Sequence, residues 1–360
     1  MAGFHHMMLS AVSSAAPAIT KVIAFFGVSS TATTPPAYEW IPDSGYGTKL
    51  ANGPTSFVQV SNDGTEISKD GTMMAYATSA SPYIVVIRVS KDGYGTAFSN
   101  PASLPAGTGR SIGFGPNNDV VTVGHQTSPY ISTYPISYAT GFGTKYANPG
   151  TAVPSTPYGS RFTSKGNELG IAGSVTPRWN VYAWSNATGY GTRYSNSYSE
   201  LSIAAQGGYW NSTGTKYISG GSQAGNYGPM YFDHVEGGGF TSMVFPGTQV
   251  PGTIYGTRFN KSNNALVTGH STTPFISAYQ WDNTTGFGTK YANPATLATN
   301  YTIGSSFTPS ETDVVSGVVQ NPNNVTAWKW SNANGFGTKY ANPATAPGTY
   351  VRGCEVYGYY

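Results

Sequence analysis

Gly286-Phe287-Gly288-Thr289-Lys290-Tyr291-Ala292-Asn293-Pro294 is the stretch that decides the fold, because this nonapeptide occurs three times without change. The other two copies run from Gly141 to Pro149 and from Gly335 to Pro343. Looser copies begin at Gly45, Gly93 and Gly189, and an eroded copy begins at Gly239. Successive starts lie 47 to 50 residues apart. A fixed period of this length predicts a propeller or another stacked array of similar units.

The composition favours an all-β protein. The 360 residues include 46 Gly, 24 Pro and 27 Tyr, which indicates many short strands and tight turns. Only 9% of the residues are charged, against about 25% in an average globular protein. The net charge of +3 is too small to indicate nucleic-acid binding. The chain has no run of apolar residues long enough to predict membrane insertion, and a single cysteine, Cys354, excludes an internal disulfide.

Each repeat predicts four antiparallel strands. In one unit, the innermost strand is expected at Arg110–Phe114, the second at Asp119–Val123 and the third at Tyr130–Ile136, and the nonapeptide forms the fourth. In the preceding unit, Asn62-Asp63-Gly64 is interpreted as the turn that follows the innermost strand. Four short antiparallel strands in every period are typical of a propeller blade.

The two ends of the chain complement each other. Tyr350–Tyr357 has the pattern of an innermost strand with nothing after it, whereas Lys21–Phe26 has the pattern of a second strand without a clear first. One blade is therefore expected to be closed by strands from both termini, which removes an open sheet edge. The sequence predicts a seven-bladed β-propeller over residues 19–360, preceded by an N-terminal arm over residues 1–18.

Two columns of mostly aromatic residues precede the first glycine of each copy, at distances of seven and five residues. A separation of two places both columns on one face of the third strand. We expect these rings to pack between blades rather than to bind a ligand, because they recur in nearly every blade. The columns are Tyr38, Val86, Tyr134, Tyr182, Phe232, Tyr279 and Trp328, and Trp40, Arg88, Ile136, Trp184, His234, Trp281 and Trp330.

Trp281-Asp282 and the blade shared between the termini resemble the WD40-like group of seven-bladed propellers. The Gly-His pairs of this chain, Gly124-His125 and Gly269-His270, stand after the second strand, so the Asp-His network of that family is not expected here. The repeated nonapeptide, with Ser128–Ser132 and Thr273–Ser277, is similar to propeller proteins of tailed bacteriophages. That resemblance implies a virion component.

Catalytic motifs are absent from the sequence. The chain has 15 carboxylates and five histidines, and none of them falls into a known hydrolase, phosphate-binding or metal-binding spacing. His125 and His270 are about three periods apart, so we interpret them as polar loop residues and not as metal ligands. We therefore expect no enzymatic activity, no cofactor and no metal.

Three sets of residues are candidates for binding a partner. The apolar arm either anchors the protein to another subunit or is a partly ordered terminus that lies on the propeller. The basic residues of the nonapeptide either guard an exposed edge strand against aggregation or form a belt for anionic ligands. The third set lies in the blade that diverges most from the repeat. The three sets are Phe4, His5, His6, Met7, Met8 and Leu9; Lys145, Lys290 and Lys339; and Gly237, Gly238 and Gly239.

Together these features predict a non-enzymatic structural protein. The expected location is a virion, as a capsid decoration or a tail-associated subunit, and the expected partners are other virion proteins. The alternative is a propeller that binds a receptor or glycan on the host surface.

Overall fold

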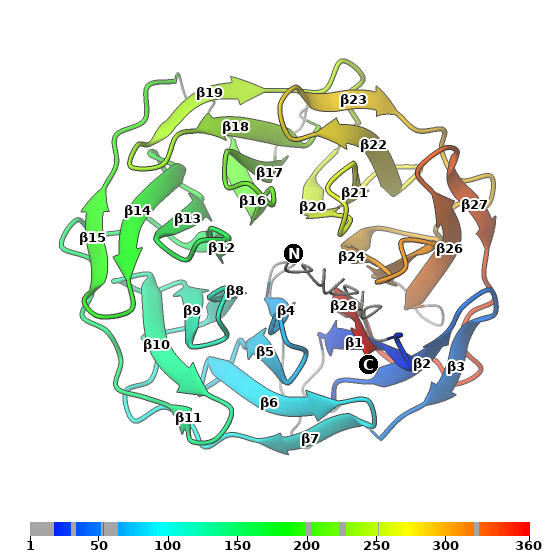
Figure 1. The fold of residues 1–360 in the computed structure, drawn as a ribbon, viewed down its shortest axis with the longest axis horizontal. Coiled ribbons are helices and arrows are strands. Elements are labelled where there is room, and N and C mark those ends of the chain that lie inside the picture. The colour runs from blue at the N-terminus through cyan, green and yellow to red at the C-terminus, as the bar shows by residue number, and fades with distance from the viewer. Residues whose placement is uncertain are drawn as a thin grey trace, which may run out of the picture.

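A computed structural model describes most of the chain and leaves out the arm residues Phe4–Leu9. The described residues are 18–29, 34–51, 53, 64–198, 203–222, 228–250, 252–319 and 324–360. They contain 28 β-strands and no helix. The strands form seven four-stranded sheets that surround one axis (Figure 1). The predicted seven-bladed, all-β propeller is thereby confirmed.

Each blade runs from an innermost strand to an outermost strand, in the following order. The first has β28 (Val351–Tyr359), β1 (Lys21–Val28), β2 (Ala37–Ile41) and β3 (Gly45–Lys49); the second has β4 (Thr65–Ile67), β5 (Met73–Ala77), β6 (Ile84–Ser90) and β7 (Gly93–Ala97). The third has β8 (Gly109–Phe114), β9 (Val120–His125), β10 (Ile131–Ser137) and β11 (Gly141–Phe142); the fourth has β12 (Pro157–Phe162), β13 (Glu168–Gly173), β14 (Trp179–Ser185) and β15 (Gly189–Arg193).

The remaining blades follow the same order. The fifth has β16 (Ala204–Trp210), β17 (Lys216–Ser222), β18 (Met230–His234) and β19 (Phe240–Val244). The sixth has β20 (Ile254–Phe259), β21 (Ala265–His270), β22 (Ile276–Asp282) and β23 (Gly286–Lys290). The seventh has β24 (Thr302–Phe307), β25 (Asp313–Val318), β26 (Val325–Ser331) and β27 (Gly335–Lys339).

The nonapeptide forms the outermost strand and joins one blade to the next. Its first glycine lies in the left-handed region that a tight hairpin requires, with φ of 78° at Gly335. Tyr291, the sixth residue of the preceding copy, packs on this glycine, where an added Cβ would lie 2.8 Å from the Cβ of Tyr291. The ring of Tyr291 also meets Trp330 edge to face at 4.9 Å. Residues of the nonapeptide therefore form the contact between neighbouring blades.

The first blade is split between the termini, as predicted. β28 pairs antiparallel with β1 from Lys21 opposite Tyr359 to Val28 opposite Val351. Figure 1 shows β28, in red, beside β1, in blue. Thr20 adds a backbone hydrogen bond to Tyr359, at 2.7 Å. This closure pairs the edge that β1 would otherwise expose.

The aromatic columns pack between the blades, as predicted. In the first column the hydroxyl or indole group also donates to a backbone carbonyl of the segment that enters the blade. Tyr279 donates to Thr248 at 2.9 Å, and Trp328 donates to Thr296 at 2.8 Å. In the five blades where the column residue is tyrosine or tryptophan, a buried ring with a satisfied polar group stabilises the blade interface. The fully buried members are Tyr38, Tyr134, Tyr182, Phe232, Tyr279 and Trp328.

One predicted turn is wrong, and it concerns the second blade. The innermost strand β4 begins at Thr65, after Asn62-Asp63-Gly64 rather than before it. The turn that follows β4 runs from Ser68 to Gly71, where Asp70 accepts a hydrogen bond from the Ser68 hydroxyl at 2.7 Å. Asn62 and Asp63 themselves lie outside the described residues. In the sequence, polar residues and glycine stand on both sides of this three-residue strand, so the pattern alone does not decide on which side the turn lies. The corrected register places Glu66 on an innermost strand.

Candidate functional site

The innermost strands bring charged side chains together inside the ring. Arg161 of β12 reaches Glu66 of β4, and Arg258 of β20 reaches Glu355 of β28. Each of these pairs spans an intervening blade, so the side chains must project toward the axis. Tyr209 of β16 lies between the two arginines. We call Glu66, Arg161, Tyr209, Arg258 and Glu355 the axial cluster.

The axial cluster is held by ion pairs and by contacts with one aromatic ring. Nε of Arg161 lies 3.3 Å from Oε2 of Glu66, and Arg161 also donates to the hydroxyl of Tyr209. Arg258 donates to Glu355. The guanidinium carbons of Arg161 and Arg258 lie 4.3 and 3.8 Å from the centroid of the Tyr209 ring. This arrangement orders two cations, two carboxylates and a phenol in one place.

Solvent reaches part of the axial cluster. The Arg161 side chain is 4% exposed, whereas those of Glu66 and Arg258 are each 17% exposed. Burial raises the pKa of Glu66 above its ordinary value, although Arg161, Arg258 and the backbone N–H of Phe114 act in the opposite direction. A carboxyl group with a raised pKa and access to water can act as a general base or acid.

A second group of polar residues lies at β-bulges near the start of the innermost strands. Arg110, Tyr158, Tyr255 and Arg352 are the extra residues at these bulges in β8, β12, β20 and β28. The guanidinium carbon of Arg110 lies 5.8 Å from the Tyr158 ring centroid. Burial and the nearby Arg110 lower the pKa of Arg352, while Tyr255 raises it. Bulges re-aim side chains and are common beside active sites. We call these four residues the bulge group.

The axial cluster brings polar groups together although the sequence contains no catalytic motif. The axial cluster takes at most one side chain from each blade, and these residues lie about one period or more apart in the sequence. A search for local motifs cannot detect such a set. An alignment of the innermost strands does reveal the set. Arg161, Arg258 and Glu355 occupy equivalent positions, because each is the third paired residue after the bulge of its strand.

His125 and His270 are buried strand residues and not polar loop residues. They end β9 and β21, and neither is exposed. Nε2 of each ring lies 3.1 Å from a serine hydroxyl, that of Ser132 or Ser277. Burial lowers the pKa of each histidine to about 4, so both are neutral at pH 7. Within the described ranges, no group of three or more His, Cys, Asp or Glu side chains is placed to hold a metal ion.

The candidate partner-binding residues fall into separate regions. The arm set, from Phe4 to Leu9, lies outside the described residues. Gly237 forms the hairpin turn of the divergent blade and donates its N–H to Glu168 at 2.8 Å. An added Cβ at Gly239 would lie 2.3 Å from the carbonyl oxygen of Ser195, so close packing accounts for this glycine. A partner-binding role for Gly237, Gly238 and Gly239 stays a prediction.

The lysines of the nonapeptide lie on the outermost strands or just beyond them, and their role as an edge guard or as a belt for anionic ligands stays a prediction. Lys145, Lys290 and Lys339 are half-buried, and burial lowers the pKa of each below its ordinary value. No helix in the described part of the chain is long and apolar enough to cross a membrane.

Comparison with known proteins finds likeness in structure only. No protein-family model and no curated protein matches the chain. A candidate 6-phosphogluconolactonase from Bacteroides fragilis is similar with a TM-score of 0.72 and 12% identity, over 94% of this chain and 98% of that one. A similar candidate from Bacteroides uniformis has a TM-score of 0.68, 10% identity and coverage of 94% and 99%. The periplasmic gluconolactonase of Pseudomonas aeruginosa has a TM-score of 0.68, 9% identity and the same coverage.

These findings correct the functional expectation. The likeness is one of fold, and it is to proteins described as lactonases rather than to virion proteins. The expectation of a non-enzymatic virion component, and of a host-surface receptor as its alternative, is therefore wrong. The expected virion location and virion partners are untested and stay predictions.

Proposed function

We propose that the protein hydrolyses lactones of sugar acids at the axial cluster. The observation that carries this proposal is the convergence of Glu66, whose pKa is raised, with two guanidinium groups and the Tyr209 hydroxyl. Lactone hydrolysis requires a base for water and donors for the oxyanion that forms on the carbonyl oxygen. The lactonases of the same fold described above support this choice of reaction.

In this mechanism Glu66 accepts a proton from a water molecule as the water oxygen attacks the lactone carbonyl carbon. The guanidinium of Arg258 and the hydroxyl of Tyr209 stabilise the negative charge on the carbonyl oxygen. The tetrahedral intermediate collapses, the bond between the acyl carbon and the ring oxygen breaks, and the departing alkoxide takes the proton from Glu66. The product is the open hydroxy acid, and Glu66 is a carboxylate again.

The bulge group has the chemistry to hold the rest of the substrate. Arg110 and Arg352 supply positive charge, and Tyr158 and Tyr255 supply hydroxyls and apolar ring faces. Hydroxyl groups and an anionic substituent on the substrate suit such a lining.

An assay of δ-gluconolactone hydrolysis tests the proposal. The rate of ring opening is measured as the amount of base needed to hold the pH constant while acid is released. We expect hydrolysis that exceeds the spontaneous rate and saturates with substrate. 6-Phosphogluconolactone, as a second substrate, shows whether an anionic substituent improves kcat/KM. Rates equal to the spontaneous rates for both lactones would contradict the proposed function.

A further inference from the structure

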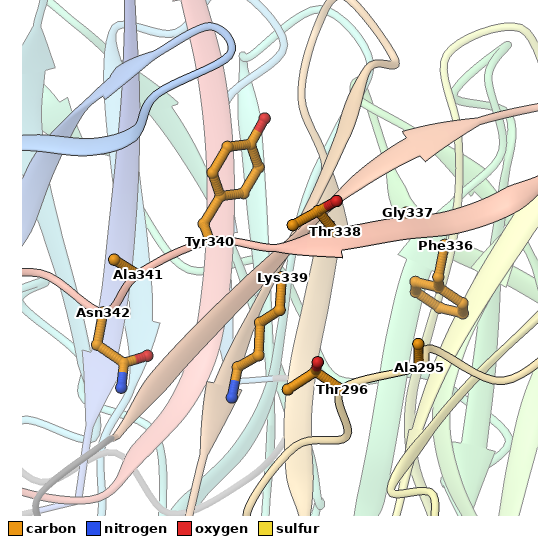
Figure 2. Close-up of a pocket in the computed structure, with 9 residues that line it drawn as sticks. All are labelled: Ala295, Thr296, Phe336, Gly337, Thr338, Lys339, Tyr340, Ala341 and Asn342. Atoms are coloured by element: carbon orange, nitrogen blue, oxygen red, sulfur yellow. The ribbon is translucent and has the colours of Figure 1, made fainter.

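Two equivalent grooves lie on the rim of the propeller, away from the axial cluster. One is lined by Phe336–Asn342 together with Ala295 and Thr296, and has a volume of about 700 Å³ (Figure 2). The other is lined by Phe287–Asn293 together with Gly247 and Thr248, and has the same volume of about 700 Å³. Each groove therefore lies between the nonapeptide of one blade and the segment that arrives from the blade before it.

Each groove contains a half-buried lysine without an acidic partner. Nζ of Lys339 donates to the carbonyl of Leu297 at 3.4 Å, and Nζ of Lys290 donates to the side-chain oxygen of Asn293 at 2.6 Å. Neither ammonium group forms an ion pair with a carboxylate in the described part of the chain. Burial lowers the pKa of both lysines, so keeping each charge in place has a desolvation cost. A bound anion would offset that cost.

A third copy of the nonapeptide repeats the same chemistry. Burial also lowers the pKa of Lys145, which holds the same place in its copy as Lys290 and Lys339. Ser103 holds the place that Thr248 holds in the other groove. The backbone carbonyl of Ser103 accepts from the Tyr134 hydroxyl at 2.7 Å, just as that of Thr248 accepts from Tyr279, so a hydroxyl residue stands at the equivalent point. Three blades therefore combine a lysine, an asparagine three residues later and a hydroxyl side chain.

Four other residues of the nonapeptide have clear packing roles in the propeller. The first glycine forms the hairpin, the phenylalanine packs against the tryptophan of the third strand, the tyrosine lies at the blade interface and the proline is buried. Thr289, Lys290 and Asn293 are exposed or half-exposed, and Lys290 makes a side-chain hydrogen bond within its own copy, to Asn293, yet the three residues are identical in the three copies. An edge guard would explain a lysine but not the accompanying threonine and asparagine.

We infer that these rim grooves bind carboxylate groups, one in each groove. In Figure 2 the side chains of Lys339 and Asn342 point toward the side where Thr296 lies, whereas Tyr340 points the other way. An ammonium, an amide and a hydroxyl together supply the donors that a carboxylate accepts. Because two such grooves lie on one rim and a third copy of the nonapeptide carries the same residues, a ligand with several carboxylates can occupy more than one site and gain affinity by multivalency.

Calorimetric titration at low salt with two probes tests the inference. Glutarate is the small carboxylate, and poly-L-glutamate of about 20 residues is the polymer. The groove variant is Lys145→Gln, Lys290→Gln, Lys339→Gln. The matched control is Lys69→Gln, Lys91→Gln, Lys261→Gln, which removes the same charge at three exposed lysines outside these grooves. Thermal unfolding of both variants verifies that they are folded.

We expect the groove variant to lose at least about tenfold in affinity for poly-L-glutamate, and the control to lose less than about twofold. Glutarate should shift the side-chain NMR signals of Lys145, Lys290 and Lys339 and not those of the three control lysines. Saturable glutarate binding without tighter polymer binding would assign the grooves to a small carboxylate. Equal losses in the two variants, or no binding to the wild type, would overturn the inference.

Discussion

Replacing Glu66 by glutamine should lower kcat for lactone hydrolysis by about 10²- to 10⁴-fold, the usual contribution of a general base. Glutamine keeps the size of the side chain and one acceptor oxygen, but its NH2 group donates where the second oxygen accepted, and it cannot take the proton of the attacking water. In the wild type the carboxylate form is the active one, so the rate should rise with pH through a pKa above the ordinary glutamate value. The measurement is a pH–rate profile of both proteins.

The matched control for this substitution is Glu236→Gln, because Glu236 is exposed and pairs with Lys165 far from the axial cluster. It should leave the rate unchanged. Since Glu66 also pairs with Arg161, the fold of the variant is checked by its cooperative unfolding. A folded Glu66→Gln protein with wild-type kcat would show that Glu66 is not the base.

Acidification should strongly destabilise the propeller through His125 and His270. Each histidine has its pKa lowered from 6.5 to about 4 by burial, so the unfolded chain binds more protons than the folded protein between these values. The free energy of unfolding therefore has its full value above pH 6.5 and decreases as the pH falls toward 4. A shift of this size corresponds to about 3 kcal/mol for each histidine. The free energy of unfolding in urea, measured across this pH range, tests the expectation.

Substituting both histidines by glutamine should flatten this pH dependence, whatever it does to stability at neutral pH. Glutamine does not titrate, and it can still contact Ser132 and Ser277. The remaining slope then comes from the carboxylates, which are the same in both proteins. If the double variant retains the wild-type slope between pH 6.5 and 4, the histidines are not its source.

The architecture could be predicted from the sequence because its signals are short-range and repeated. The nonapeptide, with its hairpin glycine and interface tyrosine, marks one blade in every period, and seven copies give the number of blades. The split blade could be predicted because the N-terminal segment lacks an innermost strand and the C-terminal segment has only that strand. One strand assignment was wrong, at the three-residue strand β4, because polar residues precede as well as follow this strand in the sequence.

The candidate site could not be predicted in the same way, because its chemistry depends on closure of the ring. Glu66 and Glu355 lie 289 residues apart in sequence (355 minus 66), and only the circular arrangement brings their blades together. The interpretation of His125 and His270 was also wrong, because they resemble loop residues beside Gly in the sequence, yet they are buried strand residues in the structure. Neither burial nor closure is visible in local spacing.

The most direct test of the central claim is a crystal structure of the protein with gluconate, the open hydroxy acid that the proposed reaction would release. The account predicts gluconate inside the ring of innermost strands, with its carboxylate within hydrogen-bonding distance of Arg258 or Tyr209 and its hydroxyl chain directed toward the bulge group. Gluconate bound only at the rim, or an axial cluster that stays unchanged at saturating gluconate, would contradict it.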